Sequence, residues 1–166
     1  MDSDKYDIES LLSDDLLKTL SDMGLKMVNV PNDGNCMFHS IALHIPSIDH
    51  VHLRNSVAWY LQFQKNMMIE YLSLTYYDVF IMQDDSFNNN WDNFISYLKG
   101  FGNWKLLPAE YILKIIAEIY NLEIVIYTNN NNNIRHIYGF NYNKDNLKKI
   151  ILVHLAELHW CSTGSI

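Results

Sequence analysis

A cysteine that follows a tight turn and opens a helical pattern is the most chemically suggestive feature of the chain. Residues 31–34 (Pro-Asn-Asp-Gly) favour a turn, because Pro fixes φ, Asn and Asp bond their own backbone, and Gly permits positive φ. From Cys36 onward, apolar residues recur at helical spacing. Cys36 is therefore predicted at a helix N-terminus, where free N–H groups and the helix dipole favour the nucleophilic thiolate and could hold an oxyanion.

A nucleophilic thiol needs a base, and histidine suits neutral pH because its unperturbed pKa is about 6.5. Of the seven histidines, His159 follows the strongest strand pattern, residues 149–155, and precedes Trp160, whose ring could shield an imidazole from water. His39 lies one helical turn after Cys36, so we expect it to pack or cap rather than act as the base. The residues alone also allow a plain alternative, in which Cys36 and His159 are ordinary structural residues.

Three further histidines, His44, His50 and His52, crowd a Pro-containing turn and are weak candidates for a metal site. No carboxylate and thiol complete a recognisable ligand pattern around them. Neighbouring histidines in loops are usually solvated, so no metal and no cofactor are expected. His136 and His154 lie in strand patterns and are interpreted as ordinary sheet residues.

Helical patterns dominate the first two thirds of the chain, and strand patterns dominate the last third. Helices are predicted over residues 8–23, 36–45, 91–98 and 108–120, with a mostly helical region in two pieces over 49–74. Extended segments are predicted over residues 25–30, 123–127, 134–138 and 149–155, with the asparagine run at 129–133 as a hairpin loop. This order predicts an α+β domain whose small sheet is packed by helices.

Composition narrows the classes of protein further. The 166 residues suit one domain, and a net charge of −7 argues against nucleic-acid binding and favours a basic partner. Two cysteines are too few for a disulfide framework or a cysteine-rich zinc site. With no membrane-length apolar run and an acidic N-terminal segment unlike a signal peptide, we expect a cytoplasmic monomer with no membrane partner.

Residues 33–38 (Asp-Gly-Asn-Cys-Met-Phe), followed by Ser-Ile-Ala at 40–42, closely resemble the catalytic cysteine block of the ovarian tumour (OTU) family of cysteine proteases, most of which are deubiquitinases. Weaker blocks follow in the family's order and extend the resemblance over about residues 16–163. They comprise Arg54, Val57, Gly102, Trp104, Glu110, residues 124–127, His159 and Trp160. Taken alone, Trp104 is better explained by packing and Glu110 by the helix dipole.

The resemblance implies roles for five residues of this chain. Cys36 would be the nucleophile, and His159 the general base and later the acid. Asp33 would support the oxyanion loop or the histidine. Backbone N–H groups of Asp33, Gly34, Asn35 and Cys36 would form the oxyanion hole.

The resemblance also implies a fold and an activity. The fold is α+β and papain-like, with a small central β-sheet packed between helices, as one domain over residues 1–166: an N-terminal packing helix in 1–24 and a catalytic core in 25–166. The implied activity is hydrolysis of isopeptide bonds after the C-terminal glycine of ubiquitin or a ubiquitin-like modifier, without a cofactor. The ubiquitin tail carries arginines, which suit an acidic chain, and a viral or pathogen protein would act in the host cytoplasm.

One position departs from the family's pattern. Many members carry Asp or Asn two residues after the histidine to hold its ring, whereas this chain has Cys161, and a thiol is a poor hydrogen-bond partner for an imidazole N–H. Asp33, another side chain or a backbone carbonyl could take over that role. The departure keeps open a weak or inactive OTU-like module that binds ubiquitin. A cysteine hydrolase of a non-ubiquitin peptide or ester is a third possibility.

Overall fold

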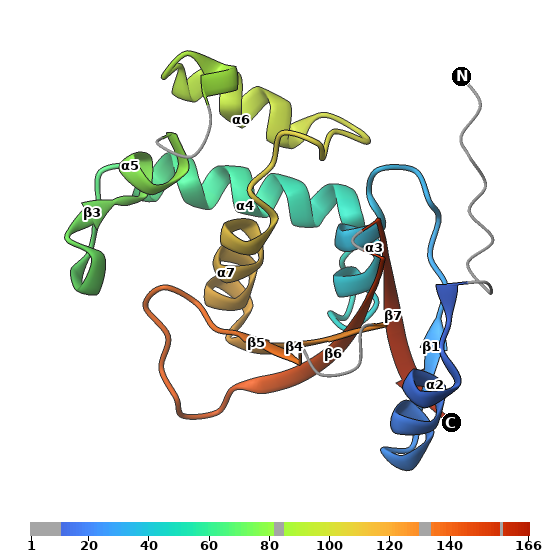
Figure 1. Ribbon diagram of the computed structural model, residues 1–166. Coiled ribbons are helices and arrows are strands. Elements are labelled where there is room, and N and C mark those ends of the chain that lie inside the picture. Colours follow the sequence, from blue (N-terminus) through green and yellow to red (C-terminus); the bar gives the residue numbers. More distant parts are fainter. Residues whose placement is uncertain (1–10, 82–84, 130–133, 157) are drawn as a thin grey trace.

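A five-stranded mixed sheet forms the centre of the protein in a computed structural model that describes residues 11–81, 85–129, 134–156 and 158–166. Its strands lie in the order β1-β7-β6-β4-β5, and only β4 and β6 are parallel (Figure 1). The strands are β1 (Leu25–Val28), β4 (Leu122–Thr128), β5 (Arg135–Ile137), β6 (Lys148–Leu155) and β7 (His159–Ser165). A separate two-stranded ladder joins β2 (Met68–Ile69) and β3 (Leu74–Thr75).

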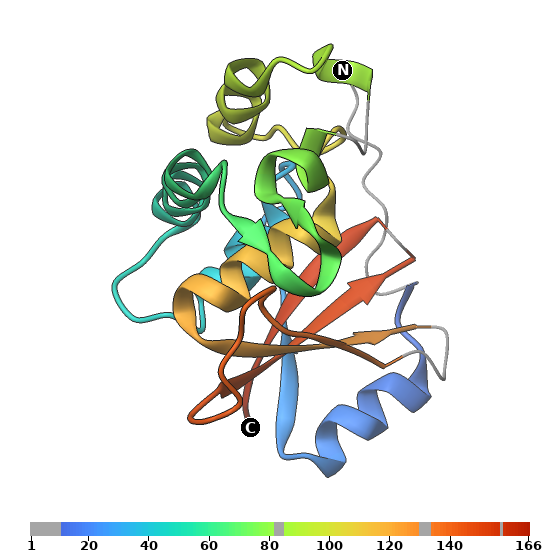
Figure 2. The ribbon, with the colours of Figure 1, turned by 90° about the vertical axis from the view of Figure 1, so that its left-hand side faces the viewer.

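Helices cover both faces of the central sheet. They are α2 (Asp14–Asp22), α3 (Cys36–Ala42), α4 (His50–Gln64), α5 (Tyr76–Ile81), α6 (Trp91–Lys99) and α7 (Ala109–Tyr120), with short 3₁₀ helices η1 (Glu70–Leu72) and η2 (Asp85–Phe87). Helices α3 and α7 lie against one face, with α4 and α6 beyond them, and α2 packs on the opposite face (Figures 1 and 2). The predicted α+β fold with a small sheet between helices is therefore confirmed. No described helix is both long and apolar enough to span a bilayer.

The alternation of side chains along β6 explains why its sequence is apolar almost throughout. Val153 and Leu155 pack with Leu16 and Leu20 of α2 on one face, while Leu152 joins the larger core on the other face. Successive side chains of a strand point to opposite faces, so a central strand covered on both sides must be apolar at nearly every position.

Several element boundaries follow local sequence signals. Cys36 begins α3 and Pro108 is the N-cap of α7, as predicted. The pairing of β4 with β5 confirms the predicted hairpin, although residues 130–133 of its loop lie outside the described part of the chain. Gly24 has a φ of 73° two residues after α2 ends, which is the left-handed conformation expected there.

The helix predicted over residues 8–23 is interrupted in the structure: Leu11 is helical, Leu12 and Ser13 are not, and residues 8–10 lie outside the described part. Helix α2 begins only at Asp14, because the Ser13 side chain accepts the N–H of Leu16 at 3.2 Å and caps it. Helix α3 likewise ends at Ala42 rather than Ile45.

The second helical piece expected within residues 49–74 is wrong. After α4 the chain forms β2, η1 and β3, with Ser73 at a left-handed φ of 53°. Met67, Met68 and Tyr71, which suggested an apolar helix face, are exposed. Periodicity misled here because those residues pack on no core.

Strand β7 was not predicted, yet it links the nucleophile helix to the histidine. Its Ser162 side chain is buried against α3 and donates to the carbonyl oxygen of Ser40 at 2.8 Å. Because the single hydroxyl proton is used there, Ser162 Oγ accepts from His44 Nε2, which lies 2.9 Å away. Two hydrogen bonds therefore hold the helix that begins at Cys36 against the strand that begins at His159.

Replacing Ser162 by Ala should lower the free energy of unfolding by about 2 kcal/mol, because the buried carbonyl group of Ser40 and the half-buried ring of His44 lose their partner. Urea unfolding followed by tryptophan fluorescence measures the change. Ser165→Ala, at the exposed end of the same strand, is the control and should shift stability by less than about 0.5 kcal/mol. Equal effects of the two substitutions would mean that the two hydrogen bonds of Ser162 do not stabilise the fold.

Candidate active site

The turn before Cys36 is closed by its own aspartate. Asp33 Oδ1 accepts the N–H of Asn35 at 3.0 Å, and Oδ2 lies 3.4 Å from His39 Nε2. Burial acts to raise the pKa of the Asp33 carboxyl, but the Asn35 N–H and His39 outweigh it, so the pKa is lowered. Asp33 is therefore charged at neutral pH, and His39 pairs with it as an accessory to the turn.

A buried arginine donates hydrogen bonds to this turn. Arg54 of α4 is only 2% exposed and donates through Nε to Asn35 Oδ1 at 3.0 Å, and through its terminal nitrogens to the carbonyl oxygens of Leu98 (2.9 Å) and Gly34 (3.2 Å). Its guanidinium also lies over the Phe38 ring, 4.2 Å from the centroid. Burial lowers the pKa of Arg54 to about 10, so the group stays charged at neutral pH. From the sequence, Arg54 was only one of the residues that resemble the family. Its role in the turn could not be predicted, because its hydrogen-bond partners are remote in the chain.

Two glycine turns meet beside the nucleophile. Asn35 Oδ1 accepts a second hydrogen bond from the N–H of Gly102 at 2.9 Å. Gly34 and Gly102 have positive φ values of 79° and 74°. A Cβ added to Gly34 would collide with the carbonyl oxygen of Gly102 and lie 2.9 Å from Trp104 Cδ1. Glycine is thus required at position 34 both by its backbone conformation and by this close approach.

Cys36 lies at the first position of α3, 9% exposed, with its thiol beside the backbone of β7. Burial raises the pKa of the thiol above its ordinary value, and the negative charge of Asp33 adds to this effect. The N–H groups of Trp160, Met37 and Cys36 itself point to the sulfur and act in the opposite direction. The resting thiol is therefore protonated at neutral pH, and it sits among donors that would stabilise it once deprotonated.

His159 directly precedes the Trp160 N–H that approaches Cys36. It is 3% exposed, and neither ring nitrogen hydrogen-bonds to any residue that the structure describes. Burial lowers the pKa of this imidazole, so it is neutral at neutral pH. The expected shielding by the Trp160 ring is wrong: side chains 159 and 160 point to opposite faces of β7, and the Trp160 ring stacks on His154 with centroids 4.0 Å apart.

Cys161 does not face the imidazole as a hydrogen-bond partner. Its buried thiol donates instead to Asn29 Oδ1, 3.5 Å away, just beyond the end of β1. Burial and the nearby charge of Cys36 raise the pKa of the Cys161 thiol to about 12. Sequence reasoning missed Asn29, since only the pairing of β1 with β7 brings residues 132 positions apart into contact.

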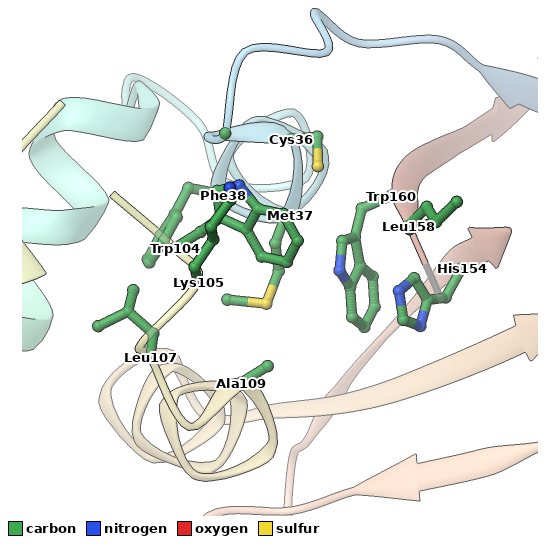
Figure 3. Close-up of a pocket in the computed structure, with 11 residues that line it drawn as sticks. Cys36, Met37, Phe38, Trp104, Lys105, Leu107, Ala109, His154, Leu158 and Trp160 are labelled. Atoms are coloured by element: carbon green, nitrogen blue, oxygen red, sulfur yellow. The ribbon is translucent and has the colours of Figure 1, made fainter. Parts of the chain in front are cut away.

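A pocket of about 160 Å³ opens beside Cys36 (Figure 3). In Figure 3 it lies between Trp160 on one side and the segment carrying Trp104 and Lys105 on the other. Its remaining walls are mainly apolar: Met37, Phe38, Leu107, Ala109 and Leu158. A small, mainly apolar pocket of this kind suits a peptide segment with small side chains.

Other residues singled out from the sequence lie apart from this chemistry. Glu110 pairs with Arg135 at 2.9 Å on the surface. His50 packs on the ring of His39, with centroids 4.1 Å apart. No group of three or more potential ligand side chains that could hold a metal is found among the described residues.

Gly34→Ala should lower the free energy of unfolding by about 3 kcal/mol, because left-handed strain adds to the collision with Gly102. Gly24→Ala is the matched control: its φ is also positive, but open space surrounds the added Cβ, so about 1 kcal/mol is expected from strain alone. Urea titration of both variants makes the comparison. Similar losses would mean that the close approach contributes nothing.

Arg54→Met should destabilise the protein by about 3 kcal/mol, since buried acceptors lose a charged donor. Arg54→Lys should recover only part of this, because one ammonium cannot reproduce the planar set of donors. Arg135→Met, which removes an exposed ion pair, should cost less than about 1 kcal/mol. Thermal unfolding of the three variants tests this order, and full rescue by lysine would contradict it.

Comparisons with known proteins identify the family and the fold. The sequence model of the OTU-like cysteine protease family matches residues 31–164, whereas a search of curated proteins finds no match. Among solved structures, the chain is similar to the OTU domain of OTUD1 (17% identity, TM-score 0.62, covering 90% of this chain and 92% of that one). It is also similar to the Hazara virus OTU bound to ubiquitin (18%, 0.51, 86% and 82%) and to an OTU deubiquitinase from Wolbachia pipientis wMel bound to ubiquitin (12%, 0.56, 86% and 97%). At these identities the structures establish the fold, and the family match establishes membership. The chain belongs to the OTU-like cysteine protease family.

Proposed function

We propose that this protein is a deubiquitinase that hydrolyses isopeptide bonds after the C-terminal glycine of ubiquitin or a ubiquitin-like modifier. The observation that carries the proposal is the placement of Cys36 at the N-terminus of α3, beside the backbone N–H that follows the buried His159. Residues 25–166 would form the catalytic core, with the N-terminal helix packed on it. Solved OTU structures similar to this chain hold ubiquitin, which supports the choice of substrate.

In this mechanism His159 first acts as a base. The neutral imidazole accepts the proton of the Cys36 thiol as Sγ attacks the glycine carbonyl carbon. The tetrahedral intermediate collapses when His159 returns that proton to the leaving lysine amine, which leaves a thioester on Cys36. Water then attacks the thioester with His159 again as base, and this step releases the modifier and restores the thiol.

The oxyanion would be held by backbone N–H groups in the turn from Asp33 to Cys36. The Asn35 N–H is already bound to Asp33 Oδ1, so Asp33 acts by fixing the turn and not by touching the reacting atoms. Each oxyanion donor is worth about 3 kcal/mol in comparable hydrolases. Arg54, through Gly34 and Asn35, holds these donors in place before substrate binds.

The pocket beside Cys36 would receive the end of the modifier's tail. Its opening lies between Trp104 and Trp160 (Figure 3). Such a small pocket favours glycine next to the scissile bond, because glycine has no side chain.

A ubiquitin probe with a C-terminal electrophile should form a covalent adduct at Cys36, seen by intact-protein and peptide mass spectrometry. Cys36→Ala should abolish the adduct, and His159→Ala should slow cleavage of a fluorogenic ubiquitin substrate by more than about a thousandfold. Both variants should keep the wild-type circular dichroism spectrum. Cleavage that persists in either variant would overturn the mechanism.

The same experiment separates two other functions. Cys161, in place of the usual Asn or Asp, favours a module that binds ubiquitin without efficient catalysis; ubiquitin binding without an adduct would support it. Reaction with general thiol electrophiles, but with no ubiquitin-like probe, would indicate a hydrolase of other peptides or esters. If ubiquitin is cleaved, a panel of di-ubiquitins would then define the preferred linkage.

A further inference from the structure

We propose that Asn29 is the positioning residue for His159: its side-chain oxygen accepts the Nδ1–H of the imidazole and holds the ring toward Cys36. This inference rests on the proposed function, in which His159 is the base. It assigns to the end of β1 the role that the residue two positions after the histidine cannot perform in this chain.

His159 needs such an acceptor. Both ring nitrogens are buried and unpaired among the residues described, which is costly for a polar group and leaves the tautomer and the ring orientation undefined. A base works only when a third group fixes the nitrogen that faces the nucleophile. The acceptor must therefore come from an element next to the start of β7.

The register of the sheet places Asn29 there. The last pair of β1 and β7 is Val28 with Ser162, so the next residue, Asn29, lies opposite Cys161. Their hydrogen bond, 3.5 Å from Sγ to Oδ1, confirms that the two side chains share a face. Side chains alternate along a strand, so His159 lies on that face as well.

Reach is sufficient for the proposed contact. Asn29 and His159 are diagonal neighbours across an antiparallel pair, for which Cβ atoms are separated by about 7 Å or less. The amide oxygen and Nδ1 each lie roughly 2.5 Å beyond their own Cβ, by standard bond lengths, so the two atoms can reach hydrogen-bond distance. Asn29 is exposed, and its present bond is to a weak thiol donor, so turning the amide from Cys161 to His159 costs little.

The competing acceptors are less suitable. Cys161 has a protonated thiol that serves as a donor and is a poor acceptor. The Asp33 carboxylate is already bonded to the Asn35 N–H through Oδ1 and pairs with His39 through Oδ2. Neither group offers His159 a free oxygen.

The direct test is the titration of His159 by NMR of histidine-labelled protein, in a Cys36→Ala background to remove the coupled thiol and with the signal assigned by His159→Gln. An oxygen acceptor favours the imidazolium, so Asn29→Ala should lower the His159 pKa by about one pH unit. Asn29→Asp should raise it by about one to two pH units, because a carboxylate favours the cation more strongly.

Asn66→Asp is the matched control, since it makes the same chemical change at an exposed asparagine just past the C-terminal end of α4, distant from β7 (Figure 1). It should leave the titration unchanged. Absence of any change in both Asn29 variants would overturn the proposal.

A second readout uses the wild-type nucleophile and no ubiquitin. Alkylation of Cys36 by iodoacetamide at pH 7 should slow by about fivefold to tenfold in Asn29→Ala. Adding Cys161→Asn to that variant should restore the rate to within about twofold, because it supplies an amide on the same face. A structural role for Asn29 would give no such rescue, so loss without rescue would count against positioning.

The two proposals can fail separately. If the ubiquitin probe does not label Cys36 while the titration and the rescue behave as expected, the proposed substrate is wrong and the positioning role stands. If the probe labels Cys36 while the Asn29 variants titrate and react like wild type, only the positioning role is wrong.

Discussion

The buried guanidinium of Arg54 is the interaction on which the site depends. A single cation on α4 joins the nucleophile turn, through Asn35 and Gly34, to the end of α6, through Leu98. Asn35 Oδ1 also accepts the N–H of Gly102, which joins the second glycine turn to the first. Among the residues that the structure describes, carbonyl and amide oxygens, rather than a carboxylate, accept the hydrogen bonds of this cation. The backbone that precedes Cys36 is thus fixed by hydrogen bonds from a buried arginine.

The two candidate catalytic residues begin neighbouring elements, Cys36 at the start of α3 and His159 at the start of β7. Cys36 comes from a helix on one face, and His159 points toward the opposite face, where α2 packs. The pairing of β1 with β7 ends at Val28, opposite Ser162, and residues 29–35 lead from there to the start of α3. The backbone N–H of Trp160, the residue after His159, is directed at the sulfur of Cys36.

Local signals predicted the elements whose ends are set by single residues. The turn at 31–34, the start of α3 and the start of α7 follow from Pro, Gly and helical spacing, and the structure confirms them. Residues 65–75 were misjudged, because helical periodicity does not distinguish apolar residues that meet a core from apolar residues left exposed. Strand β7 was missed because Ser162, Gly164 and Ser165 interrupt its strand pattern. Pairing with β1 and β6 on both sides stabilises it.

The sequence by itself determined the fold class, the family resemblance and the position of Cys36 at a helix N-terminus, since each depends on residues close together in the chain. Only the tertiary structure decided what surrounds that thiol. Arg54 reaches Leu98 across 44 positions, and Cys161 reaches Asn29 across 132. Contacts of this kind depend on strand register and helix packing, which no local pattern encodes. For that reason Cys161 read as a defect in the sequence, whereas in the fold it marks the place where Asn29 meets the histidine strand.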